Sequence, residues 1–129
     1  MKKIITIIVC SISFLVLSAC VSKKKLILPE PETISVISLQ KKISEDVKTI
    51  TKREEISKLI EEIQKQSKST TFESFNDQPT NDTDYIIIKF THQNEENDSV
   101  AYLYTIKEKQ YIEQPYVGIW EVNPDIANR

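Results

Sequence analysis

A single amphipathic helix set among strand-forming segments constrains the fold of this chain more than any other feature. Apolar residues recur at the i, i+3, i+4 and i+7 spacing of one helix face; they are Ile56, Leu59, Ile60 and Ile63. The pattern predicts a helix over residues 52–67, and Thr51 with Glu54 matches a capping box at its start. Because this helix is early and solitary, the chain does not fit a repeated βαβ layout.

Runs rich in β-branched and aromatic residues predict strands on both sides of the helix. They span residues 33–39, 47–50, 85–90, 100–106, 110–113 and 118–122. The alternation of apolar and polar residues breaks at Val36 and Ile37, which indicates either a bulge or burial on both faces. The expected fold class is α+β, in which the single helix packs on an antiparallel β-sheet of about four to six strands.

The helix stripe and the apolar strand residues are expected to form one core. Its strand members are Ile86, Ile88, Phe90, Leu103, Ile112, Ile119 and Trp120. Between the helix and the later strands, residues 67–84 are polar and rich in turn-forming Asn and Asp. Phe72 and Phe75 are expected to hold this crossing segment onto the core.

The N-terminal residues have the layout of a secretory signal peptide, in which a positively charged start precedes an apolar run. Lys2 and Lys3 follow Met1, and residues 4–17 are apolar apart from hydroxyl side chains. This run is shorter than the roughly 20 residues that a transmembrane helix needs. A cleaved signal is therefore expected rather than an uncleaved membrane span.

The end of the signal carries a further pattern. Leu17, Ser18 and Ala19 place a leucine and two small residues directly before Cys20. This resembles the lipobox of bacterial lipoproteins, whose cysteine receives a diacylglyceryl group on sulfur and becomes the first residue after cleavage. The resemblance implies that residues 1–19 are removed and that Cys20 anchors the protein to the outer face of the cell membrane. The alternative is an ordinary secretory signal that is cut at another site.

Residues 20–32 are expected to form a tether before a single domain over residues 33–129. Pro29 and Pro31 favour extended backbone, so the tether is expected to hold the domain up to about 35 Å from the membrane. The lysines that follow the anchor either bind anionic lipid, at about 1 kcal/mol each, or keep the linker soluble. The apolar residues 26–28 either dip into the membrane interface or dock on the domain.

Charge and cysteine content exclude several classes of function. Loss of Lys2 and Lys3 with the signal leaves 15 basic against 19 acidic residues, which changes the net charge from −2 to −4. This mild acidity argues against a nucleic-acid partner. Cys10 is lost with the signal and Cys20 is committed to lipid, so the domain has no thiol for a disulfide, a zinc site or a nucleophile.

The sequence contains no evident catalytic or metal-binding constellation. His92, the single histidine, is expected in a polar hairpin loop, and Asp98 and Ser99 lie nearby without a glycine elbow to hold a nucleophile. Oxygen side chains that suit calcium occur without the order of an EF-hand. They are Asp77, Asn81, Asp82 and Asp84. The chain is therefore expected not to be an enzyme and to hold no metal or other cofactor.

A bent segment near the C-terminal end is a candidate binding surface. In residues 114–120, Tyr116 and Trp120 accompany a proline and the only glycine. Exposed aromatics on a bent sheet edge bind extended peptides or sugar rings. The alternative is that Pro115 and Gly118 shape a bulge while both aromatics pack inward.

Several tyrosines are expected to share one face of the sheet. They are Tyr85, Tyr102, Tyr104 and Tyr111. Such a face is either a binding platform or a set of half-buried cross-strand pairs. Tyr102 and Tyr104 are therefore included in the candidate binding surface.

Three segments resemble an uncharacterised family of small Gram-positive lipoproteins, which is known as a domain of unknown function. They are residues 51–56 (TKREEI), 76–80 (NDQPT) and 111–120 (YIEQPYVGIW). The resemblance covers roughly residues 33–122 and implies a lipobox and a small α+β domain. It implies no activity and assigns no functional residues.

The expected function is that of a non-enzymatic binding module at the cell envelope, held by the diacylglyceryl group on Cys20. Its expected partner is a protein, a peptide or an envelope polymer. The alternative is an inhibitor or immunity-type accessory lipoprotein that occludes another protein, and the third interpretation is a small hydrolase.

Overall fold

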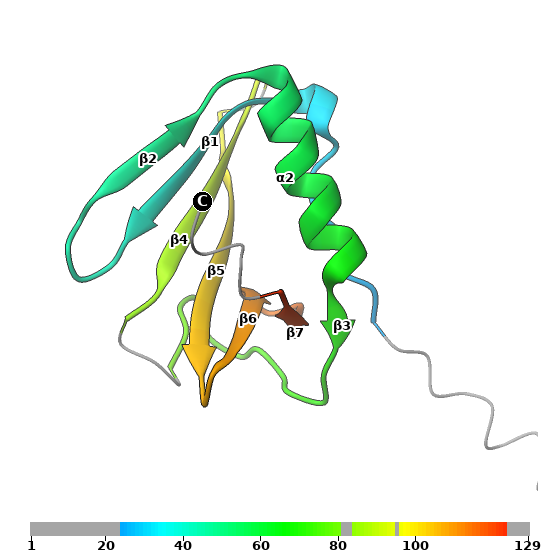
Figure 1. The fold of residues 1–129 in the computed structure, drawn as a ribbon, viewed down its shortest axis with the longest axis vertical. Coiled ribbons are helices and arrows are strands. Elements are labelled where there is room, and N and C mark those ends of the chain that lie inside the picture. Colours follow the sequence, from blue (N-terminus) through cyan, green and yellow to red (C-terminus); the bar gives the residue numbers. More distant parts are fainter. Residues whose placement is uncertain (1–23, 81–83, 95, 124–129) are drawn as a thin grey trace, which may run out of the picture.

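Seven antiparallel strands form one sheet in the order β2-β1-β4-β5-β6-β7-β3, and helix α2 lies along one of its faces (Figure 1). This computed structural model describes residues 24–80, 84–94 and 96–123. Its elements are η2 (Pro31–Thr33), β1 (Ile34–Lys41), β2 (Val47–Ile50), α2 (Arg53–Gln66), β3 (Lys68–Ser69), β4 (Ile86–His92), β5 (Ser99–Ile106), β6 (Lys109–Gln114) and β7 (Gly118–Val122). The signal peptide expected over residues 1–19 and the expected anchor Cys20 lie outside the described residues.

The predicted α+β class is confirmed, but the sheet has more strands than expected. The additional strand is β3, which pairs with β7 through Lys68↔Glu121 and Ser69↔Trp120. Two polar residues carry no hydrophobic period, so periodicity does not reveal them. They form a strand because the end of α2 brings the chain to the outer edge of β7.

Helix α2 follows the predicted stripe, and all four stripe residues are buried. It spans Arg53–Gln66, where residues 52–67 are predicted. The predicted capping box is wrong, because Lys52 is the N-cap and makes no side-chain capping hydrogen bond. Thr51 lies one residue too early to cap the first turn. The helix begins on backbone contacts instead, with the Ile56 N–H donating to the Lys52 carbonyl at 3.0 Å.

The sheet carries a core on each face, because neighbouring strand residues point to opposite sides. The larger core contains the helix stripe and strand residues that include Ile88, Phe90, Leu103, Ile112 and Trp120. The smaller core lies on the opposite face and consists of Tyr85, Tyr104, Tyr111 and Ile119. Of the predicted single core, Ile119 therefore belongs to the second cluster, and Ile86 is partly buried.

The chain before β1 packs into the larger core. Leu26 and Leu28 are buried, whereas Ile27 between them is 73% exposed. Successive side chains of an extended segment point to opposite sides, so the leucines face the core and Ile27 faces outward. Of the two alternatives for residues 26–28, the structure shows docking on the domain. The folded unit therefore begins before Thr33.

The crossing segment lies over the tyrosine face of the sheet, but only one of its two phenylalanines packs there. Phe72 and Phe75 are exposed, and the buried residues of the segment are Ser74 and Pro79. The Phe72 ring contacts Tyr111 edge to face, with the ring centroids 5.8 Å apart. The expected apolar staple is therefore present at Phe72 but not at Phe75, and hydrogen bonds of Ser74 also hold the segment in place.

The substitution Leu26→Ala is expected to lower the free energy of unfolding by about 2–4 kcal/mol, because it removes buried apolar volume and leaves a cavity. Ile27→Ala is the matched control, and we expect a change below about 0.5 kcal/mol because Ile27 faces solvent. Urea unfolding followed by circular dichroism measures both values. Equally small effects at the two positions would show that this segment does not pack on the domain.

Candidate functional site

The turn between β6 and β7 presents an exposed tyrosine on a strained backbone. The Val117 N–H donates to the Gln114 carbonyl at 3.0 Å, which closes a β-turn over residues 114–117. Pro115 occupies the second position of this turn, and Tyr116 follows at φ 63°. These features match a type II turn, in which the third residue is usually glycine or asparagine. A tyrosine in this conformation costs about 1–3 kcal/mol.

Two hydrogen bonds to the crossing segment hold Tyr116 in place. Its backbone N–H donates to Oγ of Ser74 at 3.2 Å, and its phenol donates to Oδ1 of Asp77 at 2.7 Å. The side chain is nevertheless 64% exposed. The hydrogen bond to the Asp77 carboxylate raises the pKa of the Tyr116 phenol above its ordinary value. The phenol therefore remains a protonated donor throughout the neutral range.

A buried acidic side chain supports the same turn through Ser74. Glu113 on β6 is buried and accepts a hydrogen bond from the Ser74 hydroxyl at 2.7 Å and another from the Tyr104 phenol at 3.0 Å. A buried acidic group needs such donors to offset its lost hydration. Because the Ser74 hydroxyl donates to Glu113 and accepts from the N–H of Tyr116, one network joins the sheet, the crossing segment and the turn.

Four exposed side chains lie on the two segments that this network joins. Phe72 and Phe75 come from the crossing segment, and Tyr116 and Val117 come from the turn; we call these four residues the aromatic surface. Soluble monomers usually scatter their exposed apolar residues singly, whereas a group of them marks a contact site. These four residues are therefore the candidate contact site.

A hollow of about 790 Å³ adjoins the aromatic surface between the crossing segment and β7. Its lining includes Lys24, Phe72, Tyr111, Gly118 and Trp120. A Cβ atom on Gly118 would lie 3.0 Å from Cη2 of Trp120. The only glycine of the chain thus allows the indole ring to pack against the backbone of β7.

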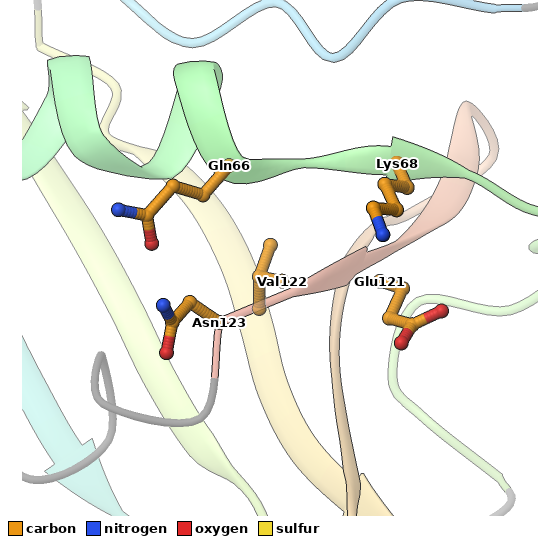
Figure 2. A pocket seen from close by; sticks show the side chains of 5 residues that line it. All are labelled: Gln66, Lys68, Glu121, Val122 and Asn123. Carbon is orange, nitrogen blue, oxygen red and sulfur yellow. The ribbon is translucent and has the colours of Figure 1, made fainter.

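A second, smaller hollow of about 390 Å³ lies where the end of α2 meets β3 and β7 (Figure 2). Figure 2 shows the side chains of Gln66 and Asn123 on one part of its rim and those of Lys68 and Glu121 on another. An ammonium, a carboxylate and two amides select no ligand class by charge. We therefore take the aromatic surface as the candidate site.

The structure separates the four residues of the predicted binding surface. Tyr116 is exposed, but Trp120 is 2% exposed and its Nε1–H donates to the Lys24 carbonyl at 3.1 Å. Tyr104 is buried with Glu113, so neither Trp120 nor Tyr104 is available at the surface. Strand alternation turns each of them into a core, which for Trp120 is the inward packing given as the alternative in the sequence analysis.

Tyr102 is half-buried and packs within the second core. Its ring meets that of Tyr85 edge to face, with the ring centroids 5.3 Å apart. Burial, with smaller contributions from Tyr85 and nearby carboxylates, raises the pKa of the Tyr102 phenol. The tyrosine face is therefore a set of cross-strand and cross-segment contacts rather than an open platform.

Sequence reasoning missed Phe72, Phe75 and Val117 as members of the surface. Two of them lie in a polar crossing segment and one lies in a turn, where no hydrophobic period distinguishes an exposed position from a buried one. A usable signal was the presence of two phenylalanines among turn-forming residues without apolar partners at strand or helix spacing.

The predicted polar loop around His92 is partly ordered as strand. His92 ends β4, and its Nε2 lies 2.7 Å from the Ser99 hydroxyl at the start of β5. A hydrolytic triad also needs a carboxylate that orients the imidazole, and the neighbouring Asp98 is exposed on the loop. In residues 24–80, 84–94 and 96–123, no group of three or more His, Cys, Asp or Glu is placed to hold a metal ion. Asn81 and Asp82 lie outside the described residues.

Comparison with known proteins identifies a family and a structural neighbour. The model of the family DUF5301, described as "Domain of unknown function (DUF5300)", matches residues 22–121. The chain is also similar to a protein from Ruminococcus gnavus with an NMR structure, at 26% sequence identity and a TM-score of 0.64. That match covers 80% of this chain and 99% of the other. A comparison with curated proteins gave no match.

Substitutions at Tyr116 are expected to separate backbone strain from side-chain contacts. Tyr116→Gly removes the strain of positive φ but loses the phenol contact, so the free energy of unfolding should change by less than about 1 kcal/mol. Tyr116→Val should lower it by about 1–3 kcal/mol, because a β-branched residue is poorly tolerated at positive φ. Urea unfolding of both variants measures the difference. Equal stability of the two would contradict the strained turn.

Proposed function

The chain belongs to the DUF5301 family, and because membership assigns no activity, we propose the function from the geometry. The protein is a lipoprotein anchored through Cys20 on the outer face of the membrane. Its small domain is a non-enzymatic interaction module, and the aromatic surface is its contact site. The observation that carries this proposal is the exposed Tyr116 ring on a backbone that favours glycine.

The strain at Tyr116 supports a contact role. Folding alone would be served better by glycine at this position, since an exposed ring contributes little to burial. The chain nevertheless positions the ring with a serine, an aspartate and a buried glutamate. Side chains that fold at a cost and remain exposed are characteristic of sites that act on something outside the protein.

The chemistry of the aromatic surface supports binding rather than catalysis. It offers two phenyl rings, one phenol and one isopropyl group, none of which is a base or an activated nucleophile. Such groups contribute apolar area and ring faces to a contact. We therefore propose a contact with a partner and assign no cofactor.

The position of the folded unit along the chain supports the proposed anchor. The family match begins at Ser22, two residues after Cys20, so the matched domain follows directly on the lipobox-like segment. In the part of the chain that the structure describes, no helix has the length and apolarity to cross a membrane. Two acyl chains on Cys20 would provide the firm attachment that a lipoprotein requires.

A second candidate function rests on the β1–β2 hairpin. Strand β2 is an edge of the sheet, and Ile43 and Val47 on the hairpin are exposed. An exposed edge strand with apolar side chains is suited to pair with or cover another protein. This observation favours the inhibitor or immunity-type alternative, in which the hairpin would be the contact site.

The substitution Cys20→Ala is expected to release the protein from the membrane, because it removes the sulfur that carries the diacylglyceryl group. Fractionation of cells and medium measures the distribution, and mass spectrometry of the N-terminal peptide measures the modification. Ser22→Ala is the matched control and should leave both unchanged. Membrane retention of the Cys20→Ala protein would contradict the anchor.

Two exposed valines allow a direct test of the contact site. Val117 on the aromatic surface is 49% exposed and Val47 on the hairpin is 56% exposed, and each can be replaced by cysteine in a mature chain without another free thiol. We expect a membrane-impermeant maleimide to label Val117→Cys about tenfold more slowly on cells than in the unanchored Cys20→Ala background, a factor equivalent to about 1.4 kcal/mol. Val47→Cys should label equally in both.

The two positions distinguish the two proposed functions. Protection at Val117 with free labelling at Val47 supports the aromatic surface as the contact site. The reverse pattern supports the hairpin and the inhibitor or immunity-type function. Equal labelling at both positions on cells contradicts both contact sites.

A further inference from the structure

The chain enters the fold beside the aromatic surface. The Lys24 carbonyl accepts a hydrogen bond from the Trp120 indole at 3.1 Å, and the Lys24 ammonium donates to the Val117 carbonyl at 2.9 Å. Because Val117 belongs to the aromatic surface, the first described residue is held directly against the turn that presents Tyr116. While these two hydrogen bonds are intact, Lys24 stays in contact with the aromatic surface.

The length of chain before Lys24 limits the distance to the proposed anchor. Cys20 precedes Lys24 by four residues, and a fully extended chain of that length spans at most about 14 Å. The sequence-based estimate of about 35 Å assumed a tether that runs freely to residue 32. The docking of Leu26 and Leu28 removes most of that length. An anchor at Cys20 therefore brings the aromatic surface within reach of the lipid headgroups.

The composition around the turn suits a membrane interface. Tyrosine is enriched at the level of the headgroups, phenylalanine is found on the apolar face of segments that lie in the interface, and lysines are attracted by anionic lipid. Lys24 and Lys25 are exposed at the start of the described chain, and Ile27 projects outward beside Gln114, whose amide donates to the Ile27 carbonyl at 2.8 Å.

Three acidic residues lie close to the aromatic surface and oppose a purely electrostatic attraction. Glu73 and Glu121 line the larger hollow together with Lys109, and Asp77 accepts a hydrogen bond from the Tyr116 phenol. The contact therefore has to depend mainly on the apolar side chains, with the lysines beside the anchor as a smaller contribution.

We propose that the aromatic surface lies against the outer leaflet of the bilayer that holds the anchor, so that the domain rests on the membrane in one orientation. This inference rests on the proposed lipidation of Cys20, and it names the partner of the aromatic surface as lipid. Figure 1 shows the β1–β2 hairpin on the side of the molecule opposite to the start of the described chain. The membrane-seated domain thus directs Ile43 and Val47 away from the bilayer.

The test uses the mature lipoprotein purified from membranes, with an environment-sensitive fluorophore on Val117→Cys or on Val47→Cys. Each protein is added to preformed vesicles of equal parts phosphatidylglycerol and phosphatidylcholine, so that it inserts from outside. At position 117 we expect a blue-shifted emission and about a tenfold loss of quenching by aqueous iodide relative to the unanchored chain. At position 47 we expect neither change.

A second pair of variants tests whether the apolar side chains make the contact. Phe75→Ser removes an exposed ring of the aromatic surface, and Ile43→Ser removes an exposed apolar side chain of the hairpin. Phe75→Ser should restore most of the iodide quenching at position 117, whereas Ile43→Ser should leave the protection intact. Protection that survives Phe75→Ser would overturn the proposal, because closeness to the anchor alone would then explain it.

The mass of the N-terminal peptide from the same preparation distinguishes failure of the proposed anchor from failure of the proposed orientation. If Cys20 carries the lipid and position 117 is quenched as freely as position 47, the membrane-seated orientation is wrong and the anchor stands. If Cys20 is unmodified, the proposed anchor fails and this inference fails with it. Protection at position 117 on cells but not on lipid vesicles would also overturn the inference, because the partner would then not be lipid.

Discussion

The hydrogen bond from the Trp120 indole to the Lys24 carbonyl fixes the point at which the chain enters the fold. It becomes possible because Gly118 has no Cβ atom, so that the indole packs against the backbone of β7 and places its N–H beside the entering segment. From that point, alternation along an extended chain directs Leu26 and Leu28 into the core. The segment that contains Leu26 and Leu28 is consequently part of the domain.

The second face of the sheet depends on the hydrogen bonds of a buried acidic side chain. Glu113 is buried, where an acidic side chain loses hydration, and the hydroxyls of Ser74 and Tyr104 replace part of it. Each such hydrogen bond contributes roughly 0.5–3 kcal/mol, of the same order as the roughly 1–3 kcal/mol that positive φ costs at Tyr116. Since Ser74 also binds the Tyr116 N–H, the network that satisfies the carboxylate holds the strained turn.

Periodicity predicted the parts of this fold that repeat and missed those that do not. The helix stripe and the six longer strands bury regular patterns, so their positions followed from the sequence. Strand β3 contains two residues and exists because of where α2 ends, and the capping box failed by a single residue. Such features depend on tertiary position.

The candidate site was less accessible to prediction for the same reason. Tyr116 was identifiable beside Pro115, since proline and an aromatic residue mark a turn that presents a side chain. Trp120 and Tyr104 lie in strands, where burial depends on which face each residue occupies, and register decides that. Phe75 lies in an irregular segment, and its exposure follows from the hydrogen bonds of the adjacent Ser74.

A small aromatic surface can orient a whole domain because the proposed anchor changes the nature of the contact. A surface of four side chains binding from solution would be weak, and a dissociation constant of about 1 mM corresponds to about −4.1 kcal/mol. A short link converts that encounter into an intramolecular one with an effective concentration of the order of 1 mM, so that a contact with a dissociation constant of about 0.1 mM, or about −5.5 kcal/mol, is occupied about nine-tenths of the time, as tenfold protection requires. In the proposed arrangement the two acyl chains attach the protein to the bilayer, and the aromatic surface determines only the orientation of the domain. The same arithmetic explains why the length of chain before Lys24 matters: a longer free tether would lower the effective concentration and leave the hairpin without a fixed orientation.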